Sequence, residues 1–420
     1  QHIVENSGAT VVFAEDDKQV QKFRAERSRL PNLKKVVQIA GEVADSDGWV
    51  VSLGTLTAEA LVDEAVLVER RRAVTRESIL TLIYTSGTTG RPKGVVTTHD
   101  NMLYEAEAIQ QINVIREQDV ELLFLPLAHV FAKVLECVWV HSGHVMAFAE
   151  SMHTIKENLA ETRPTVMAGV PRIFEKFYGA VVQKGLAAGG LKRALFERAQ
   201  ALSEKRGELE AKGQTLPVAE TLQFAALQRL VFSKVSRALK QNLGGRMRVL
   251  VSGGAPLAPK IAWFFRDAGV DILEGFGLTE TSAATCLNRP GRNHIGTVGL
   301  PMPGTQVRLA PDGELLIKGR GVAKGYWQNE EATAEVFKDG WFASGDVARI
   351  EADGAVRIVD RKKDLIVTAG GKNVAPQNIE NLVKTHRLIS QVVVHGDRRN
   401  FLSALITLDA DALKVFAEER

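Results

Sequence analysis

The chain has 420 residues, more than one small hydrophobic core accommodates, so two or more domains are expected. A hydrophobic content of 45% and a charged content of 25% are ordinary for a globular protein, and a net charge of +3 is too small to indicate nucleic-acid binding. The sequence shows no apolar run near the roughly 18 residues of a membrane span and no signal-peptide pattern. Cys137 and Cys286 are far apart, which favours a reducing compartment over a disulfide-stabilised fold.

The first 16 residues, QHIVENSGATVVFAED, have the pattern of a helix followed by a strand. The chain begins with Gln1 rather than Met. We therefore expect the sequence to be a piece of a longer protein.

Four later stretches share one scheme, in which an apolar run is followed by a glycine- or proline-bearing loop and then by a helical pattern. They cover residues 78–94, 120–138, 164–182 and 247–269. Continuous apolar strands that alternate with helices predict a mostly parallel sheet covered on both faces. In such folds ligands bind beyond the carboxyl ends of the strands, where these loops lie.

Residues 183–243 interrupt this scheme with charged, helical sequence. One apolar stripe on it consists of Phe224, Leu227, Leu230, Val231, Val235 and Leu239. The stripe predicts a helical pair that packs on the main domain. A lipid-facing surface is the alternative interpretation.

After about residue 295 the pattern changes to short strands. Residues 309–319 and 348–361 have the pattern of hairpins, with Asp-Gly turns at 312–313 and 353–354. From Leu365 onward a strand, a helix and a strand follow, which predicts a small α+β unit.

The stretch YTSGTTGRPKG at residues 84–94 combines glycines, hydroxyl residues and a lysine. A Walker loop needs G-x-x-x-x-G-K-[ST], but here Lys93 follows Pro92 and precedes Gly94. The composition still suits a polyphosphate, because glycines let backbone amides approach an anion and Lys93 adds a positive charge. A plain surface turn is the structural alternative.

This stretch resembles the phosphate loop of the adenylate-forming (AMP-binding) superfamily. Four further stretches resemble that family's motifs, in the family's order: SGGAPL (252–257), EGFGLTE (274–280), DGWFASGD (339–346) and DRKKDLIVTAGGKNVAP (360–376). The subfamily that looks most similar is the long-chain fatty acyl-CoA synthetases. Aryl- or short-chain acyl-CoA synthetases, peptide-synthetase adenylation domains and a catalytically silent nucleotide-binding relative remain alternatives.

The resemblance implies an α/β fold with a large multilayer αβαβα domain, parallel sheets and a small β-rich part, followed by a smaller α+β domain. We expect a large ATP- and acyl-binding domain at 1–359, a hinge at 360–364 and a partial C-terminal domain at 365–420. It also implies a further N-terminal region and a C-terminal lysine that are not in this sequence. The piece by itself is therefore expected to retain nucleotide binding better than the first half-reaction.

The implied reaction has two steps. A fatty-acid carboxylate attacks the α-phosphate of ATP and releases pyrophosphate, and the thiol of coenzyme A then attacks the acyl carbonyl and releases AMP. ATP, Mg²⁺ and coenzyme A are the expected cofactors and co-substrates. The expected location is the cytoplasm, with peripheral contact at the inner face of the membrane as an open alternative; no nucleic-acid partner is expected.

The resemblance also implies site residues. The β- and γ-phosphates are assigned to Thr85, Ser86, Gly87, Thr88, Thr89, Gly90 and Lys93. The adenine site is assigned to Phe276, as the stacking ring, with Gly253, Gly254, Ala255, Glu274, Gly275 and Gly277. The chemical step is assigned to Lys93, His129, Thr279, Glu280 and Arg361.

Three further roles follow from the resemblance. Glu280 is expected to hold Mg²⁺, with Ser86 as a second contact. Asp346 is expected to accept both ribose hydroxyls, Arg361 to reach the ribose or α-phosphate, and Ile358 to pack beneath the nucleoside. Lys363 matches the family's hinge position.

Each of these residues also has an ordinary structural interpretation. Phe276 and His129 could be core or structural residues, and Glu280 could favour a helix dipole. Asp346 could belong to a Ser-Gly-Asp turn, and the charges around Lys363 could be simply solvated.

Overall fold

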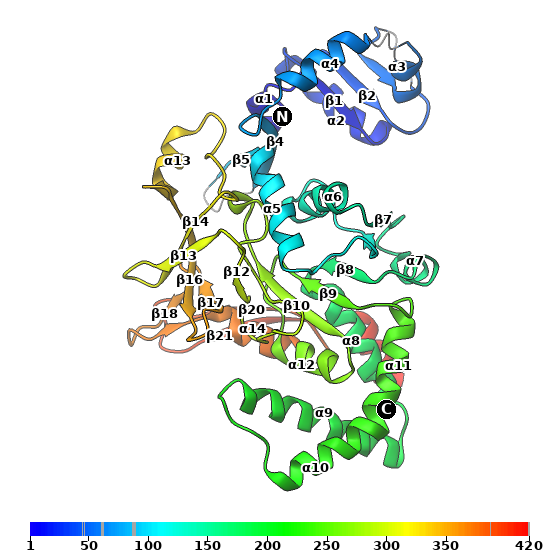
Figure 1. Ribbon diagram of the computed structural model, residues 1–420, viewed down its shortest axis with the longest axis vertical. Coiled ribbons are helices and arrows are strands. Elements are labelled where there is room, and N and C mark those ends of the chain that lie inside the picture. Colours follow the sequence, from blue (N-terminus) through cyan, green and yellow to red (C-terminus); the bar gives the residue numbers. More distant parts are fainter. Residues whose placement is uncertain (44, 46, 60–62, 86–89, 387, 419–420) are drawn as a thin grey trace. The chain divides into compact units, whose positions relative to one another are not determined.

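The computed structural model describes residues 1–420 except 44, 46, 60–62, 86–89, 387 and 419–420 (Figure 1). The chain forms two compact units: residues 1–101 with 323–337, and residues 102–322 with 338–420. This division differs from the expected limits at 360–364, which stay a prediction.

The first unit begins with a parallel sheet of order β1-β2-β3. Its core contains Ala14, Val20, Val36 and Trp49. The predicted N-terminal helix and strand are confirmed. The elements are α1 (His2–Ser7), β1 (Val11–Ala14), α2 (Asp17–Glu26), η1 (Arg27–Arg29), β2 (Lys35–Gln38), β3 (Val50–Ser52), α3 (Leu53–Glu59) and α4 (Glu64–Ala73).

A hairpin of β4 (Ile79–Thr85) and β5 (Lys93–Thr98) follows. The strand at 78–84 is confirmed, and a helix does follow its loop, but only after a second strand that the strand–loop–helix scheme does not include. The loop returns directly into an antiparallel strand, because residues 95–98 are β-branched Val and Thr, which favour a strand. Helix α5 (His99–Gln111) begins only after β5, and α13 (Glu330–Val336) also contributes to this unit.

The second unit contains a sheet of order β12-β11-β10-β9-β8-β6-β7. Strands β7, β6, β8, β9 and β10 are parallel, whereas β11 and β12 are antiparallel. The predicted parallel sheet is therefore confirmed here. Its strands are β6 (Val120–Leu123), β7 (Val145–Phe148), β8 (Val166–Gly169), β9 (Val249–Ser252), β10 (Asp271–Phe276), β11 (Cys286–Leu287) and β12 (Leu300–Pro301).

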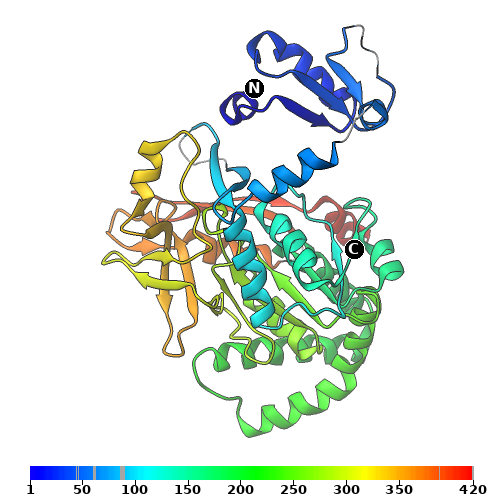
Figure 2. The ribbon, with the colours of Figure 1, turned by 45° about the horizontal axis from the view of Figure 1, so that its top comes forward.

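Helices cover both faces of this sheet. Figures 1 and 2 show α6 on one face, and α8 and α12 on the other. Pro171 and Pro259 each stand at the start of a helix, where a missing N–H is tolerated. The helices of this part are α6 (Val130–Ser142), α7 (Ile155–Thr162), α8 (Pro171–Leu186) and α12 (Pro259–Asp267).

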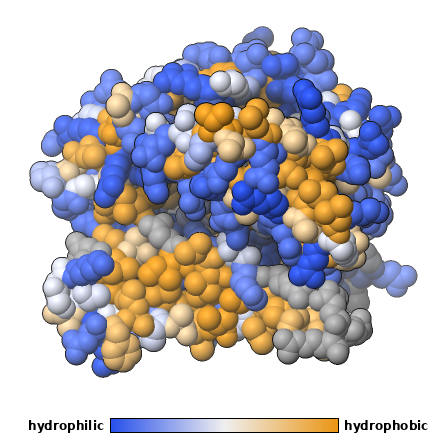
Figure 3. All heavy atoms as spheres, turned by 90° about the horizontal axis from the view of Figure 1, so that it is seen from below, coloured by the Kyte–Doolittle hydropathy of each residue, from blue (hydrophilic) through white to orange (hydrophobic). Residues whose placement is uncertain are grey.

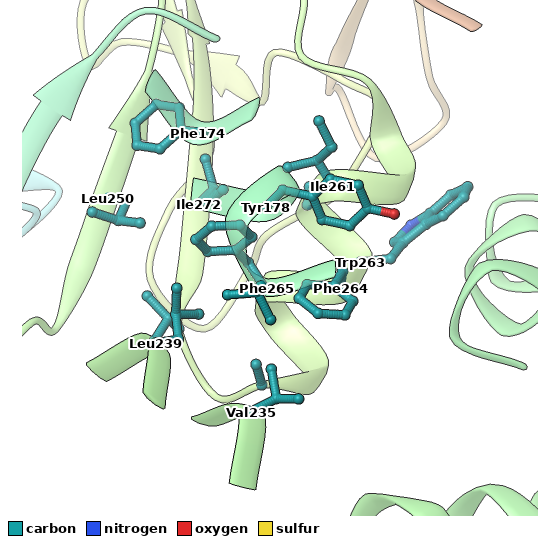
Figure 4. Packing of buried hydrophobic residues seen from close by; sticks show 14 of the residues in the cluster. Phe174, Tyr178, Val235, Leu239, Leu250, Ile261, Trp263, Phe264, Phe265 and Ile272 are labelled. Atoms are coloured by element: carbon teal, nitrogen blue, oxygen red, sulfur yellow. The ribbon is translucent and has the colours of Figure 1, made fainter. Parts of the chain in front are cut away.

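The main core lies between the sheet and α8, α12 and the helical insert. Figure 4 shows Phe264 and Phe265 of α12 pointing among Tyr178, Leu250 and Ile272. The rings of Tyr178 and Phe264 meet edge to face, with centroids 5.1 Å apart. This packing fixes the strands whose ends carry the candidate site.

The helical insert consists of α9 (Gly190–Glu210), α10 (Val218–Leu227), a π-helical turn η2 (Gln228–Phe232) and α11 (Ser233–Asn242). The predicted packing of a helical pair is confirmed, but its stripe is wrong at one position. Leu230 is 59% exposed and Phe232 is buried in its place. The wider π turn changes the phase of the helix there, which a regular 3.6-residue period does not anticipate.

The β-rich part forms a second sheet in which β13 (Gln306–Leu309), β14 (Glu314–Lys318), β16 (Trp341–Ile350) and β17 (Val356–Arg361) pair antiparallel. Strand β15 (Phe337–Lys338) pairs at its edge. Gly313 and Gly354 have φ of +84° and +85° in the turns, so both predicted Asp-Gly hairpins are confirmed.

The C-terminal part has a small core of its own, around Ile366, Val392 and Val394. The predicted α+β character is confirmed. Its elements are β18 (Ile366–Val367), β19 (Asn373–Val374), α14 (Pro376–Lys384), β20 (Ile389–His395), β21 (Ser403–Leu408) and α15 (Ala410–Glu418).

Candidate active site

The predicted phosphate loop connects the two strands of the β4–β5 hairpin. Ser86, Gly87, Thr88 and Thr89 lie outside the described residues. Thr85 and Lys93 are paired across the hairpin at the two ends of the loop, and the Lys93 Nζ lies 5.0 Å from the centroid of the Tyr326 ring. Within the first unit, the hairpin therefore places a lysine directly at the mouth of the loop.

Gly90 and Gly94, near the end of this loop, are favoured as glycines for different physical reasons. Gly90 has φ of +154°, a conformation that side chains rarely adopt. A Cβ at Gly94 would lie 3.0 Å from the Tyr84 ring, so a larger residue would have to displace that ring slightly. Packing against Tyr84 thus favours a small residue at position 94.

The segment from Phe276 to Thr285 is a tight loop at the end of β10. A Cβ at Gly277 would lie 1.2 Å from the Ala283 carbonyl oxygen, and one at Gly275 would lie 2.8 Å from Leu287 Cδ1. Close packing against backbone therefore requires the glycine at 277, whereas a side chain at 275 would have to displace the end of Leu287.

Thr279 and Glu280 lie in the short turn η3 (Thr279–Thr281) of this loop. The Leu278 N–H donates to Thr281 Oγ1 at 3.0 Å, and Thr285 Oγ1 donates to the same hydroxyl at 2.8 Å. Both Thr279 and Glu280 are half-buried. Internal hydrogen bonds thus fix the turn that presents them.

Glu274 connects two of the predicted motifs. Its Oε1 accepts the Leu257 N–H at 3.2 Å, which ties β10 to the 252–257 loop. Burial raises the pKa of the Glu274 carboxyl to about 7, against the opposing effects of the Leu257 donor and Arg357. In that loop Gly253 is buried, whereas Gly254 and Ala255 are exposed. Glu274 therefore has a structural contact that its sequence context did not indicate.

Asp346 and Arg361 face each other across β16 and β17. Arg361 Nε lies 3.7 Å from Asp346 Oδ1, and Asp346 Oδ2 is buried with no hydrogen-bond partner among the described residues. Burial raises the pKa of the Asp346 carboxyl to about 6; the Arg361 charge opposes this, and the carboxylates of Asp360, Glu314 and Asp364 add to it. A buried acceptor oxygen without a donor fits a hydroxyl-bearing ligand.

The structure also places the remaining predicted site residues, His129, Ile358 and Lys363. His129 is exposed and precedes the first residue of α6. Ile358 is half-buried on β17, and Lys363 is exposed in the turn after it.

One buried carboxyl was not predicted. Glu105, on α5, is fully buried, and its Oε2 accepts the Ala284 N–H at 3.1 Å. Burial raises its pKa well above the usual range. Its contact holds the loop after η3, where Ala283 has φ of +100°. The two contact partners are 179 residues apart, so no sequence pattern signals them.

An Mg²⁺ ion at Glu280 would need oxygen ligands from its surroundings. In the described part of the chain, no three His, Cys, Asp or Glu side chains gather as a metal cluster. An Mg²⁺ ion held by Glu280 would therefore take most of its ligands from phosphate oxygens and water. That coordination is usual for Mg²⁺ bound with a nucleotide, so the residues fit.

The family models agree with the motif order. A model described as AMP-binding enzyme matches residues 1–327, and one described as AMP-binding enzyme C-terminal domain matches residues 363–420.

Curated relatives are similar over most of the chain. Long-chain-fatty-acid–CoA ligase FadD15 of Mycobacterium tuberculosis is 41% identical over 415 residues, covering 98% of this chain and 67% of that protein. Long chain acyl-CoA synthetase 4 of Arabidopsis thaliana is 33% identical over 444 residues, covering 99% and 65%. The chain thus spans about two thirds of the length of these relatives.

Solved structures share the fold. The anthranilate CoA ligase AuaEII in complex with anthranoyl-AMP has a TM-score of 0.71 and 21% identity, covering 100% of this chain and 73% of that one. ATP-bound MatB from Rhodopseudomonas palustris has a TM-score of 0.67 and 23% identity, covering 100% and 74%. The expected α/β fold is confirmed, and the chain belongs to the AMP-binding enzyme family.

Proposed function

We propose that the whole protein activates a long-chain fatty acid with ATP and transfers the acyl group to coenzyme A. The observation that carries this proposal is the 41% identity, over 98% of the chain, to a relative named long-chain-fatty-acid–CoA ligase. In the first step a carboxylate oxygen attacks the α-phosphorus and pyrophosphate leaves. In the second step the thiol sulfur attacks the acyl carbonyl, loses its proton and displaces AMP.

The nucleoside half of ATP would bind in the second unit. Asp346 would accept the ribose hydroxyls through its buried carboxylate, and Arg361 would reach the ribose or the α-phosphate. Phe276 would stack on adenine and Ile358 would pack beneath the nucleoside. The Gly253, Gly254 and Ala255 backbone would line the far side of the base.

The phosphates would bind to residues of the loop at 85–93. Lys93 would neutralise charge on the β- and γ-phosphates, and Thr279 would donate to the α-phosphate. Mg²⁺, held by Glu280 with Ser86 as a second contact, supplies charge neutralisation at the phosphates when it is bound. Catalysis of this type rests on positioning and charge stabilisation, which is the work of these residues.

The acyl half has fewer assigned residues. His129 would position the carboxylate near the α-phosphate. Lys363 would be the hinge about which residues 365–420 move against residues 1–359 between the two steps.

Peripheral contact with an anionic lipid surface is part of this proposal. Val218, Leu222 and Leu230 are exposed on α10 and η2 at four- and eight-residue spacings, beside exposed Arg229 and Arg237. Residues 187–242 hold ten Lys and Arg against five Asp and Glu, while the whole chain carries only +3. Figure 3 shows the molecule from the side on which α9 and α10 lie in Figure 1, and apolar and hydrophilic residues are mixed on this side as a whole. An apolar row flanked by basic residues is typical of interfacial helices. None of the helices in the described ranges is long and apolar enough to cross a membrane.

The proposal is tested by ATP–pyrophosphate exchange with the full-length protein. Exchange that depends on a long-chain fatty acid supports it. Exchange stimulated only by an amino acid would indicate a peptide-synthetase-type domain. Binding of ATP or AMP in a calorimeter, without turnover of any carboxylate, would indicate a silent nucleotide-binding relative.

A further inference from the structure

A β-bulge lies at the strand position that carries Asp346. Between β14 and β16, Glu314 pairs with Val347 and Leu316 pairs with Ala343, so three residues of β16 stand opposite one of β14. Gly345, in the middle of these three, has φ of +74°. Bulges are found beside active sites, where they turn a side chain in a new direction. Here the bulge leaves Asp346 only 4% exposed.

Glu314 bonds the backbone group at the centre of this bulge. The Gly345 N–H donates to Glu314 Oε1 at 2.8 Å. Gly345 is half-buried, and its N–H would lose water without gaining an acceptor if Glu314 were absent, so this contact stabilises the bulged conformation. The Glu314 carboxylate thus holds the residue directly before Asp346.

The second oxygen of Glu314 holds the neighbouring strand. Lys362 Nζ lies 2.9 Å from Glu314 Oε2 and 2.6 Å from Asp312 Oδ2, and the Lys362 N–H donates to the Gly345 carbonyl at 2.8 Å. Lys362 is the residue directly after Arg361. Glu314 therefore contacts one neighbour of each member of the Asp346–Arg361 pair.

The side chains of Glu314 and Lys362 differ in their exposure to solvent. The Glu314 side chain is 13% exposed, whereas that of Lys362 is 48% exposed. An ion pair to an exposed lysine contributes little by itself, because solvent screens it. The hydrogen bond from Gly345 to the shielded carboxylate is the stronger element, since charge-assisted bonds exceed neutral ones.

We infer that Glu314 is a positioning residue for the nucleoside-binding pair Asp346 and Arg361. One carboxylate fixes the bulge that directs Asp346 inward and the strand end that carries Arg361 opposite it. Glu314 has no direct role in the reaction. This inference rests on the proposed function only in treating that pair as the ribose-binding pair.

The test compares variants of the full-length protein in AMP-binding calorimetry and in ATP–pyrophosphate exchange. Glu314→Ala is expected to weaken AMP binding and raise the KM for ATP on the order of tenfold, because a charge-assisted bond is lost at the bulge. The KM for the fatty acid should stay unchanged. Glu314→Gln keeps one acceptor oxygen for Gly345 and should show a smaller effect. Lys362→Arg should bind AMP as the wild type does.

A matched control lies on the same pair of strands. Glu351, which follows β16, pairs with Arg357 of β17 at 2.7 Å, away from the bulge. Glu351→Gln should leave AMP binding unchanged. If Glu314→Ala binds AMP like the wild type, or if Glu351→Gln weakens binding equally, the inference is wrong. Should Glu314→Ala fail to fold, Glu314→Gln carries the test, and wild-type affinity for AMP together with a wild-type KM for ATP in it would overturn the inference.

The two proposals fail in different ways. If the wild type shows no exchange with any carboxylate, the proposed function fails, yet AMP affinity still tests Glu314. If exchange is normal and AMP affinity ignores Glu314, only the positioning role fails.

Discussion

Arg361 Nε lies 3.7 Å from Asp346 Oδ1, at directly paired positions of two neighbouring strands. The two side chains differ in exposure: 6% for Asp346 and 48% for Arg361. The carboxylate is therefore fixed and shielded, while the guanidinium can reorient toward a ligand. This asymmetry suits a site in which a buried acceptor binds hydroxyls and an exposed cation meets a phosphate.

The Asp346 carboxyl should make stability depend on pH. Its pKa is raised from an ordinary value of 3.8 to about 6 in the folded chain. Between these values the folded state binds the proton more tightly than the unfolded state does. The free energy of unfolding should therefore fall as pH rises through this window, by on the order of 3 kcal/mol, and then level off.

The substitution Asp346→Asn checks this effect. Urea unfolding between pH 4 and 8 should show a weaker decline in the variant than in the wild type, and a more stable variant at pH 7. AMP binding should be weaker, because the carboxylate acceptor is gone. Equal pH dependence in the two proteins would mean that Asp346 is not the titrating group.

Lys93 should be necessary for the first half-reaction. Lys93→Ala removes a charge at the mouth of the phosphate loop and should lower the exchange rate on the order of a hundredfold or more. Arg91→Ala, an exposed cation of the same loop, is the control and should remain near wild type. A similar loss in both variants would indicate a general effect of loop charge rather than a phosphate contact of Lys93.

Lys363 should matter for the second half-reaction. Lys363→Pro fixes the backbone φ near −65° and should impair thioester formation more than adenylation. Lys363→Ala keeps the torsional freedom and serves as the control. Single-turnover assays of the two steps separate the effects, and an equal loss in both steps would argue against a hinge.

The α10 surface should bind anionic vesicles. Leu222→Ser combined with Leu230→Ser should reduce co-sedimentation with phosphatidylglycerol vesicles, and Arg229→Gln with Arg237→Gln should reduce its salt dependence. Val145→Ser, an exposed apolar residue on β7, is the control. Wild-type co-sedimentation of both double variants would exclude this surface, and a dimer that dissociates in the leucine variant would assign it to a second copy.

Much of the fold follows from local sequence. The strands and helices at 120–138, 164–182 and 247–269 were predictable because apolar runs end at Gly or Pro before a helical period begins. The hairpins at 312–313 and 353–354 were predictable because Asp-Gly supports the positive φ that such turns need.

Some elements and contacts in the structure were not predicted from the sequence, for physical reasons of two kinds. Some are local: the β-branched residues after Lys93 make a second strand that the strand–loop–helix scheme did not include, and the π turn at 228–232 shifts Leu230 outward. Others depend on tertiary contacts, as with Glu314, whose partners Gly345 and Lys362 are 31 and 48 residues away. The ordered motifs identify the candidate site residues in the sequence. The tertiary contacts that hold these residues in place can be seen only in the structure.

The most direct test of the account is ATP–pyrophosphate exchange by the full-length protein with carboxylic acids of increasing chain length. If the protein is a long-chain fatty acid–CoA ligase, exchange should be strong with long-chain fatty acids, weak with short or aryl acids, and lost in Glu280→Ala. If none of the carboxylic acids supports exchange, or if only amino acids do, the proposed ligase activity is contradicted.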